Sequence, residues 1–347
     1  MLHRYLKINS YSLIRSFKAM VCVEYGHPLI LQEKKRQELN KGEVRIRTRY
    51  AGINYADSLA WIGKYQEKAK LPFSPGLEVS GEIIECNGCK NRHVGDRVYC
   101  IFSSSGGYSE ECVVDESRCF VIPDSIPFEV ISSLGINFCT ASLGLNVVGN
   151  MKKGDLVTIT GAAGGTGLAA SELSIMTGNE TVCIVRGTAQ KEYLTTFMKS
   201  QYPNSCVHII DSEATPSFRD FLKSLGGSSL VFDTVGTDSL FCSQLLRSVR
   251  FGARLLIIGF SGGSIQQIPA NHLLVKNVSV LGVYLGGYLK NCPSCVEESI
   301  NRLYSLYLTK QLHPQVSQVF PLSEANEAMK MNKVYGKLLF DVFSKSK

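Results

Sequence analysis

The chain has 347 residues, of which 44% are hydrophobic and 19% are charged, and its formal net charge is +7 at pH 7. This composition is that of an ordinary globular protein, and the length favours two domains. No run approaches the roughly 18 consecutive apolar residues of a membrane span, and the charge beyond residue 16 is spread too thinly to mark a nucleic-acid interface. We therefore expect neither a membrane span nor a nucleic-acid partner.

The first 16 residues form a basic segment that contains no acid and several serines. On a helix its basic and apolar residues fall on opposite sides, the basic ones being Arg4, Lys7, Arg15 and Lys18 and the apolar ones Leu2, Leu6, Leu13 and Phe17. This pattern is typical of a mitochondrial presequence. We expect residues 1–16 to be a targeting segment and the protein to be in the mitochondrial matrix. If they form a disordered arm instead, we expect a cytoplasmic protein.

Residues 17–143 have the pattern of a β-rich domain. Short strand-like runs are bounded by glycine, proline or serine, at residues 44–50, 78–85, 96–101 and 112–114. In residues 44–50, basic residues alternate with other residues, which predicts a half-exposed strand.

Residues 144–289 change to alternating strands and helices. The predicted strands are residues 156–160, 181–186, 207–211, 230–235, 253–259 and 278–284, and helical patterns lie between them, for example at 168–176 and 240–249. This alternation predicts an α/β domain with a doubly wound parallel sheet. Residues 290–347 add a helix at 295–310 and a closing strand at 336–342, and we expect this segment to return to the first domain.

A glycine cluster follows the first predicted strand of the second domain and reads Gly161-Ala162-Ala163-Gly164-Gly165-Thr166-Gly167. Glycines let the backbone turn sharply and approach a pyrophosphate, and the start of the following helix attracts its negative charge. The strand before the cluster and the helix after it favour a dinucleotide site over a simple tight turn. Ala162 occupies the position of the first glycine in the usual pattern.

The end of the second strand indicates which dinucleotide binds. An NAD enzyme needs an acid there for the ribose 2′-hydroxyl, but the chain has no acid between Val185 and Glu192. Arg186 and Lys191 could meet a 2′-phosphate, with a hydrogen bond from Thr188. We therefore predict NADPH rather than NADH; the alternative is that both cations are simply solvated.

The 12 cysteines are scattered through the chain. Because the sequence has no secretory signal, we expect reduced thiols rather than a disulfide framework. Cys86/Cys89 and Cys292/Cys295 have the spacing of metal ligands, but a four-thiolate zinc site requires the two pairs to meet, and nothing in the sequence brings them together.

From about residue 17 to residue 342, the chain resembles the medium-chain dehydrogenase/reductase superfamily, and within it the zinc-free quinone oxidoreductase branch. The likeness rests on the glycine cluster and on the motifs Ala51-Gly52-Ile53-Asn54-Tyr55-Ala56-Asp57, Pro75-Gly76-Leu77-Glu78-Val79-Ser80-Gly81, Val94-Gly95-Asp96-Arg97-Val98, Phe232-Asp233-Thr234-Val235-Gly236, Ile268-Pro269-Ala270-Asn271 and Gly336-Lys337. Ala162 is normal in that branch. The resemblance implies a GroES-like β-rich catalytic domain at 17–143 and a Rossmann domain that binds NADP at 144–289.

The resemblance also bears on zinc. Zinc alcohol dehydrogenases of the superfamily place a cysteine ligand where this chain has Asn54 and a histidine ligand where it has Leu77. We therefore expect no bound metal to polarise an alcohol or aldehyde oxygen. Quinones and α,β-unsaturated carbonyls remain suitable acceptors, because they spread the incoming charge into a phenolate or an enolate.

The family positions imply the site residues. Tyr65 matches a tyrosine that is catalytic in related mitochondrial enoyl-thioester reductases, so it is a candidate proton donor; the alternative is an aromatic wall against the cofactor. Asn54 is expected to orient the nicotinamide or the acceptor, or else to hold its own turn, whereas Asp57 is expected to be structural. The implied cofactor contacts are Thr140, Ala163, Gly164, Gly165, Thr166, Gly167, Arg186, Thr188, Lys191, Val235, Gly236, Gly259, Phe260, Val283, Tyr284, Leu285 and Lys337, the last adding charge toward the phosphate.

The sequence thus favours a zinc-independent enzyme that transfers hydride from NADPH to a quinone or an α,β-unsaturated carbonyl. Two alternatives stay open, namely an enoyl-thioester reductase of mitochondrial fatty-acid synthesis and an NADPH-binding protein without catalysis. The family also implies a homodimer in which the last strands of two nucleotide sheets, at residues 278–284, pair edge to edge.

Overall fold

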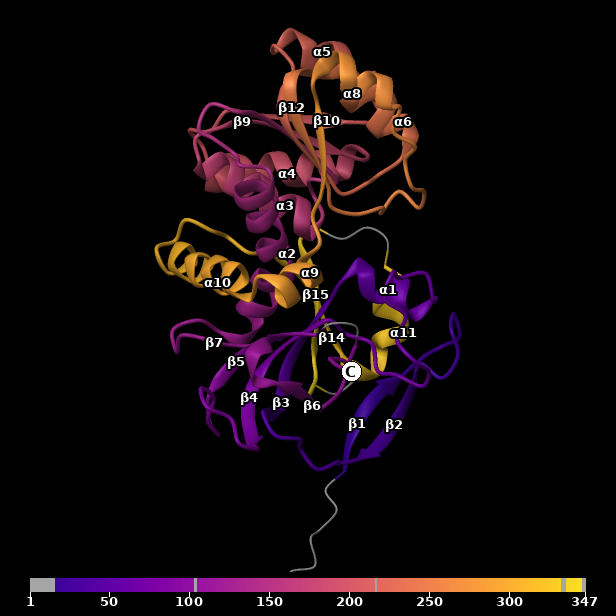
Figure 1. The fold of residues 1–347 in the computed structure, drawn as a ribbon, viewed down its shortest axis with the longest axis vertical. Coiled ribbons are helices and arrows are strands. Elements are labelled where there is room, and N and C mark those ends of the chain that lie inside the picture. Colours follow the sequence, from indigo (N-terminus) through magenta and orange to yellow (C-terminus); the bar gives the residue numbers. More distant parts are fainter. Residues whose placement is uncertain (1–15, 103–104, 216, 332–334, 345–347) are drawn as a thin grey trace, which may run out of the picture.

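The computed structural model describes residues 16–102, 105–215, 217–331 and 335–344. The predicted targeting segment therefore lies outside the described residues, apart from Ser16. Phe17 and Lys18, which the helical placement of that segment included, belong to strand β1 (Ser16–Val21). The described chain forms two domains, one above the other in Figure 1, with α2, α9 and α10 between them.

The first domain is built on a seven-stranded sheet in the order β14-β15-β3-β4-β5-β7, with β6 paired to β3. The C-terminal strands β14 and β15 complete this sheet, and β15 pairs antiparallel with β3, so the C-terminal segment returns to this domain. The elements of this domain are β1, β2 (Ile30–Lys35), β3 (Glu43–Ile53), α1 (Tyr55–Trp61), β4 (Glu78–Cys86), β5 (Arg97–Ile101), β6 (Glu111–Asp115), β7 (Cys119–Val121), β14 (Val316–Pro321), α11 (Ala325–Ala328) and β15 (Lys337–Asp341).

The second domain has a six-stranded parallel sheet in the order β10-β9-β8-β11-β12-β13. This order confirms the predicted doubly wound Rossmann fold. The first three strands extend the sheet toward one edge, and the fourth strand lies on the other side of the first, so that the later strands extend the sheet toward the opposite edge. Its elements are β8 (Leu156–Thr160), α3 (Gly165–Met176), β9 (Glu180–Val185), α4 (Thr188–Gln201), β10 (Val207–Asp211), α5 (Arg219–Ser224), β11 (Ser228–Asp233), α6 (Asp238–Leu240), α7 (Leu246–Ser248), β12 (Val249–Ile257), α8 (Ala270–Lys276) and β13 (Ser279–Gly282).

Alternate residues of the parallel strands enter two different cores. Val157 and Ile159 of β8 pack with α2 (Phe128–Ser142), α3 and α10 (Pro293–Leu308), whereas Leu156 packs with α5 and α7 on the other face. Burial on both faces explains why these strands read as continuous β-branched and apolar runs rather than as alternating ones. The two cores fix the sheet between its helices, and this positions the loops at its carboxyl edge.

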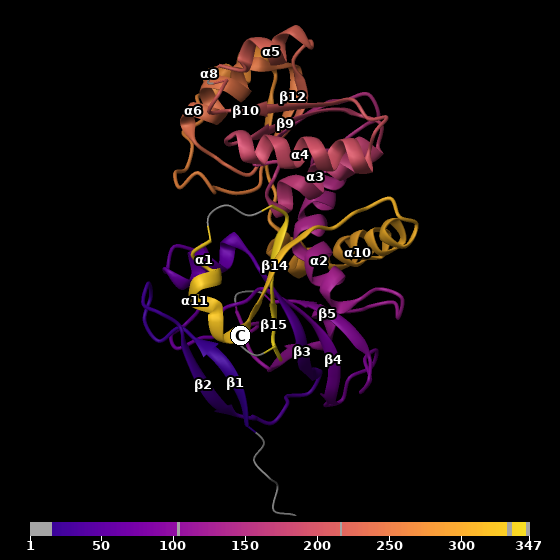
Figure 2. The same ribbon diagram turned by 180° about the vertical axis from the view of Figure 1, so that it is seen from behind.

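Helix α2 joins the two domains. It continues through a π-helical turn, and the stretch Phe128–Val148 is long and apolar enough to cross a bilayer. However, 72% of its apolar window is buried inside the fold, as is usual for a core helix. Figure 2, the view from behind, shows β14 and β15 beside α2 at this junction.

Three local predictions were wrong. The predicted helix 240–249 is divided into α6, a π-helical turn (Phe241–Leu245) and α7, and Val249 already begins β12. Arg45 of β3 was expected on an exposed face but is 2% exposed, and its guanidinium bonds the Glu85 carboxylate 2.8 Å away. Cys292 and Cys295 form a disulfide between α9 (Leu285–Asn291) and α10, although the sequence predicted reduced thiols.

Candidate cofactor and substrate site

The glycine cluster forms a tight turn between β8 and α3. Gly161 has φ +61°, a conformation that L side chains rarely adopt, and Gly164 is the N-cap of α3. A Cβ on Gly167 would lie 2.2 Å from the Gly161 carbonyl oxygen, so only glycine lets the helix approach the strand this closely. The first N–H groups of a helix lack partners within it, and α3 has no acid in its first turn. This arrangement suits a pyrophosphate.

The first domain contacts this loop directly. The Gly336 N–H donates to the Ala163 carbonyl at 3.1 Å, and the Thr166 hydroxyl donates to the Asn137 side chain of α2 at 3.2 Å. The predicted pyrophosphate cradle therefore lies at the junction between the domains, in contact with residues of both.

A buried carboxylate organises the next two loops at the same edge. Asp233, at the end of β11, accepts hydrogen bonds from the Thr160 hydroxyl at 2.5 Å and from the N–H groups of Val235 at 3.1 Å and Gly236 at 3.2 Å. Burial raises its pKa. A Cβ on Gly236 would lie 2.7 Å from the Phe260 ring, so these two predicted residues lie side by side. Sequence reasoning quoted Asp233 in a motif but assigned it no role.

The turn after β9 presents the predicted cations. Arg186, Thr188 and Lys191 are all exposed at the start of α4. Asp211 at the end of β10 accepts a hydrogen bond from the Gly187 N–H at 2.7 Å, and the Glu213 carboxylate also lies beside Gly187, 3.2 Å from the position of an added Cβ. A hydrogen bond from the Glu213 N–H lowers the Asp211 pKa. Asp211 is thus bound to the backbone, and the turn presents two exposed cations to an adenosine ribose, with the Glu213 carboxylate beside them.

The exposed cations of this turn predict that the protein binds NADPH more tightly than NADH. We expect Arg186→Ala and Lys191→Ala each to raise the Kd for NADPH about tenfold, because each removes a charge-assisted hydrogen bond of about 1.4 kcal/mol to a 2′-phosphate. The Kd for NADH should stay unchanged, since NADH lacks that phosphate. Fluorescence titration measures both constants, and Lys199→Ala on the exposed end of α4 is the control. An equal loss for both dinucleotides would contradict this role.

A buried polar network lies on the first domain's side of the junction. The Lys337 ammonium donates to the Asn54 carbonyl oxygen at 2.6 Å and forms an ion pair with Glu78. The Asn54 side-chain amide donates to Glu78 at 3.0 Å. The other Glu78 oxygen accepts from the Tyr99 hydroxyl at 2.5 Å and from the Ile136 N–H at 3.0 Å. Lys337 was expected to add charge toward the phosphate, but its ammonium is engaged within this network.

Asp57 is in the first turn of α1 and forms a capping box with Asn54, the N-cap of this helix. Its carboxylate accepts from the Asn54 N–H at 2.8 Å and from the Tyr108 hydroxyl at 3.0 Å. The side chain is 1% exposed, and burial raises its pKa to about 6. This placement fits the structural role predicted for Asp57.

The raised pKa of Asp57 predicts a pH dependence of stability. Its ordinary pKa is 3.8, so between pH 3.8 and about 6 the folded chain binds more protons at this site than the unfolded chain. The free energy of unfolding therefore falls as pH rises through this window, by on the order of 3 kcal/mol. Urea unfolding at pH 4 to 8 should show this component in the wild type and in the exposed-site control Asp220→Asn, but not in Asp57→Asn.

Tyr65 meets the second domain through Tyr284, the residue that precedes α9. The two phenols are close enough for each to influence the pKa of the other, and the Tyr284 hydroxyl donates to Glu67 at 2.6 Å. Tyr65 is half-buried, and burial raises its pKa, with a further increase from the Glu67 charge. The phenol therefore keeps its proton at neutral pH. Glu67 was missed in the sequence because it lies in a loop without a motif.

The remaining predicted contacts lie around the same junction. Val283 and Leu285 are buried on either side of Tyr284, and the Val283 N–H donates to the Ile257 carbonyl at the end of β12 at 3.0 Å. Thr140 is half-buried on α2. Gly259 lies beside Thr234, whose carbonyl oxygen would be 3.5 Å from an added Cβ.

The residues at the family's zinc position do not fit a zinc ion. Leu77 is buried and has no donor atom, and the carbonyl oxygen of Asn54 is bound by Lys337. Zinc in proteins takes thiolate, imidazole or carboxylate ligands. In the described part of the chain, the group of Glu180, Cys206 and His208 is the one that gathers three such side chains, and it lies on the second domain's sheet.

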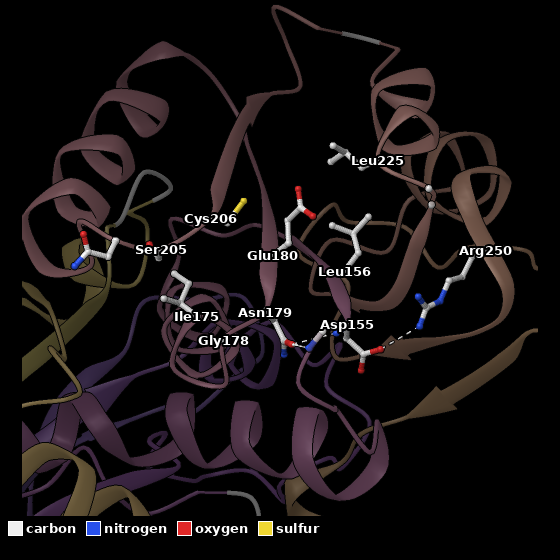
Figure 3. Close-up of a pocket in the computed structure, with 14 residues that line it drawn as sticks. Asp155, Leu156, Ile175, Gly178, Asn179, Glu180, Ser205, Cys206, Leu225 and Arg250 are labelled. Carbon is white, nitrogen blue, oxygen red and sulfur yellow. Dashed lines mark hydrogen bonds and ion pairs between the residues drawn. The ribbon is translucent and has the colours of Figure 1, made fainter.

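A cavity of about 590 Å³ lies away from this site. Its lining includes Asp155, Glu180 and Cys206 (Figure 3), which all lie at the amino ends of parallel strands. Dinucleotides bind at the carboxyl edge of such a sheet, where the glycine loop is. The cavity is therefore separate from the candidate cofactor site.

Comparison with known proteins agrees with this architecture. Residues 40–124 match the family described as alcohol dehydrogenase GroES-like domain, and residues 165–303 match the family described as zinc-binding dehydrogenase. Over 328 residues, the chain is 35% identical to a quinone oxidoreductase-like protein 2 homolog from Nematostella vectensis, with 91% of this chain and 86% of that protein covered. It is 32% identical to quinone oxidoreductase-like protein 2 from Bos taurus, with 94% and 93% covered.

A solved structure extends the comparison. The quinone oxidoreductase from Thermus thermophilus, whose complex with NADPH was also determined, superposes with a TM-score of 0.79 at 26% identity, with 94% of this chain and all of that chain covered. The chain belongs to the medium-chain dehydrogenase/reductase superfamily, among its quinone oxidoreductase-like proteins. This membership confirms the predicted family.

Proposed function

We propose that the chain is a zinc-independent oxidoreductase that transfers hydride from NADPH to a quinone or an α,β-unsaturated carbonyl. The observation that carries the proposal is the substrate side of the junction, where Asn54, fixed by Lys337, and the buried Leu77 occupy the family's metal-ligand positions and Tyr65 supplies a protonated phenol. The name of the Nematostella vectensis relative and the NADPH complex of the Thermus thermophilus enzyme support the same class.

The residues at the domain junction fit NADPH. The first turn of α3 and the glycines beside it accommodate a pyrophosphate, and Arg186 and Lys191 remain exposed for a 2′-phosphate. When bound, NADPH supplies a hydride from its nicotinamide ring. The loops after β11 and β12, which are joined by a hydrogen bond from the Gly262 N–H to the Val235 carbonyl, support the nucleotide between these two ends.

The protein groups support an acceptor that carries its own electron sink. With no metal to polarise an isolated carbonyl, the new negative charge must spread within the acceptor, as it does in a quinone or an enone. Tyr65 donates a hydrogen bond or proton to the developing oxyanion, because its phenol is protonated and lies at the domain junction. Asn54 is a positioning residue whose amide is fixed by Lys337 and Glu78.

Stopped-flow oxidation of NADPH by the full-length protein tests the proposal. The acceptors are 9,10-phenanthrenequinone, a short enone and crotonyl-CoA, each with and without a metal chelator. We expect fast oxidation with the quinone or the enone that the chelator does not slow. Dependence on added zinc, or turnover with crotonyl-CoA alone, would overturn the proposed acceptor class. NADPH binding without turnover of any acceptor would instead indicate a non-catalytic nucleotide-binding protein.

We also propose a homodimer through β13. This strand is at the edge of the parallel sheet, so its outer backbone groups have no partner strand in the described chain. Leu274 and Val275 of the preceding helix α8 are 81% and 72% exposed, which is costly unless a partner covers them. Light scattering should give about twice the 38.2 kDa of one chain, and Leu274→Glu combined with Val275→Glu should give a monomer. A monomeric wild type at micromolar concentration would refute the dimer.

A further inference from the structure

Three potential metal ligands meet on the second domain's sheet, at the edge opposite the cofactor site. Glu180 begins β9, Cys206 immediately precedes β10, and His208 is the second residue of β10. Residues two apart on a strand point to the same face, and the parallel register places His208 opposite Val182. Cys206, His208 and Glu180 therefore share one face because of the backbone pairing, not because of one chance side-chain rotamer.

The distances between the donor atoms are close to those of a tetrahedral site. The three atoms all lie within 4.8 Å of one another, with 2.8 Å from Glu180 Oε1 to His208 Nε2 and 3.9 Å from Cys206 Sγ to the same nitrogen. With a zinc–sulfur bond of about 2.3 Å and zinc–nitrogen or zinc–oxygen bonds of about 2.0 Å, tetrahedral ligands are separated by roughly 3.3 to 3.6 Å. The observed distances lie on either side of this range, so small side-chain shifts complete the geometry.

The surroundings hold the ligands but leave an open side. The His208 ring packs edge-on against Phe221 of α5, with 5.4 Å between ring centroids, which limits its rotation. Cys206 is exposed, and with Glu180 it lines the 590 Å³ cavity (Figure 3). A fourth ligand, such as water, can therefore reach the ion from the cavity.

We propose that Glu180, Cys206 and His208 bind one zinc ion at the amino edge of the Rossmann sheet. Thiolate, imidazole and carboxylate together form a set that zinc accepts, whereas magnesium and calcium prefer oxygen ligands alone. Three protein ligands and an open fourth position make the ion exchangeable. The site is separate from the zinc position of the family near Asn54 and Leu77, so it does not depend on the proposed reaction.

Cobalt substitution tests the site in the full-length protein. Reduced, metal-free protein is titrated with Co²⁺, and the cobalt is then displaced with Zn²⁺. We expect one equivalent of Co²⁺ to give a sulfur-to-cobalt charge-transfer band and tetrahedral visible bands, and Zn²⁺ to abolish both. The variants are Cys206→Ser, His208→Gln and Glu180→Gln, with Cys242→Ser as the matched control, because Cys242 is a half-buried thiol of the same domain.

Each ligand variant should weaken Co²⁺ binding at least tenfold, and Cys206→Ser should also remove the charge-transfer band. Cys242→Ser should bind as the wild type does. NADPH affinity, measured on the same samples, should be unchanged in all four variants, because the cofactor loop lies at the other edge of the sheet; this shows that the variants are folded. A band that survives in Cys206→Ser, a band that disappears in Cys242→Ser, or no stoichiometric binding by the wild type would overturn the proposal.

Discussion

Replacing Tyr65 with phenylalanine should lower kcat with a quinone or enone acceptor by at least about a hundredfold, while the Kd for NADPH changes less than twofold. A positioned general acid typically contributes 10² to 10⁴ in rate. The Tyr65 phenol is half-buried at the domain junction, and burial keeps it protonated. Phenylalanine retains the ring and removes only the hydroxyl. Single-turnover oxidation of NADPH, followed by absorbance, measures the chemical step apart from product release.

The controls separate proton donation from packing. Tyr55→Phe removes an exposed hydroxyl from α1, in the same domain, and should behave as the wild type does. Tyr284→Phe removes the hydroxyl that neighbours Tyr65 and donates to Glu67, so we expect a smaller loss of kcat than in Tyr65→Phe. If Tyr65→Phe keeps the wild-type kcat, the residue is an aromatic wall against the cofactor and the proton comes from water.

The fold could be predicted well because its elements are local patterns. The predicted strand 156–160 coincides with β8, since a parallel strand buried on both faces gives a nearly uninterrupted apolar run, and the predicted strand 207–211 coincides with β10, a partly buried edge strand. The alternation of strands and helices then predicts a parallel, doubly wound sheet. The helix predicted at 240–249 failed because periodicity cannot reveal a π-helical turn, nor the point where tertiary packing starts a strand.

The cofactor loop could be predicted for a related reason, since its glycines act through their own backbone. The substrate side could not, because its geometry depends on buried acids with distant partners. Glu78 and Lys337 are 259 positions apart, and neither forms a local pattern with the other. Both residues of the ion pair lie in motifs of the family, Gly76-Leu77-Glu78 and Gly336-Lys337. However, the sequence did not show that they pair, so we predicted that Lys337 faces a phosphate. Arg45 was mispredicted similarly, because its partner Glu85 lies on the neighbouring strand.

The Glu78–Lys337 pair should be essential for stability as well as for the site. Lys337→Met leaves the fully buried Glu78 carboxylate without its cation, and breaking one side of a buried ion pair costs about 3 to 5 kcal/mol. Urea unfolding should show this loss, whereas Lys64→Met, which removes an exposed lysine, should leave the free energy of unfolding within about 0.5 kcal/mol of wild type. Because Asn54 also loses its donor from Lys337, we expect the surviving activity of Lys337→Met to be reduced.

A double variant distinguishes charge from packing in this prediction. In Lys337→Met combined with Glu78→Gln, the glutamine carbonyl can still accept from Tyr99 and the Ile136 N–H, and no unpaired charge stays buried. We therefore expect most of the lost stability to return, as when a buried pair is replaced by neutral groups. Activity should not return with it, since Asn54 has still lost the ammonium that fixes its carbonyl oxygen. If both stability and activity return in the double variant, Lys337 serves only the fold. If neither returns, the stability lost in Lys337→Met comes from the packing of the lysine side chain and not from the unpaired Glu78 charge.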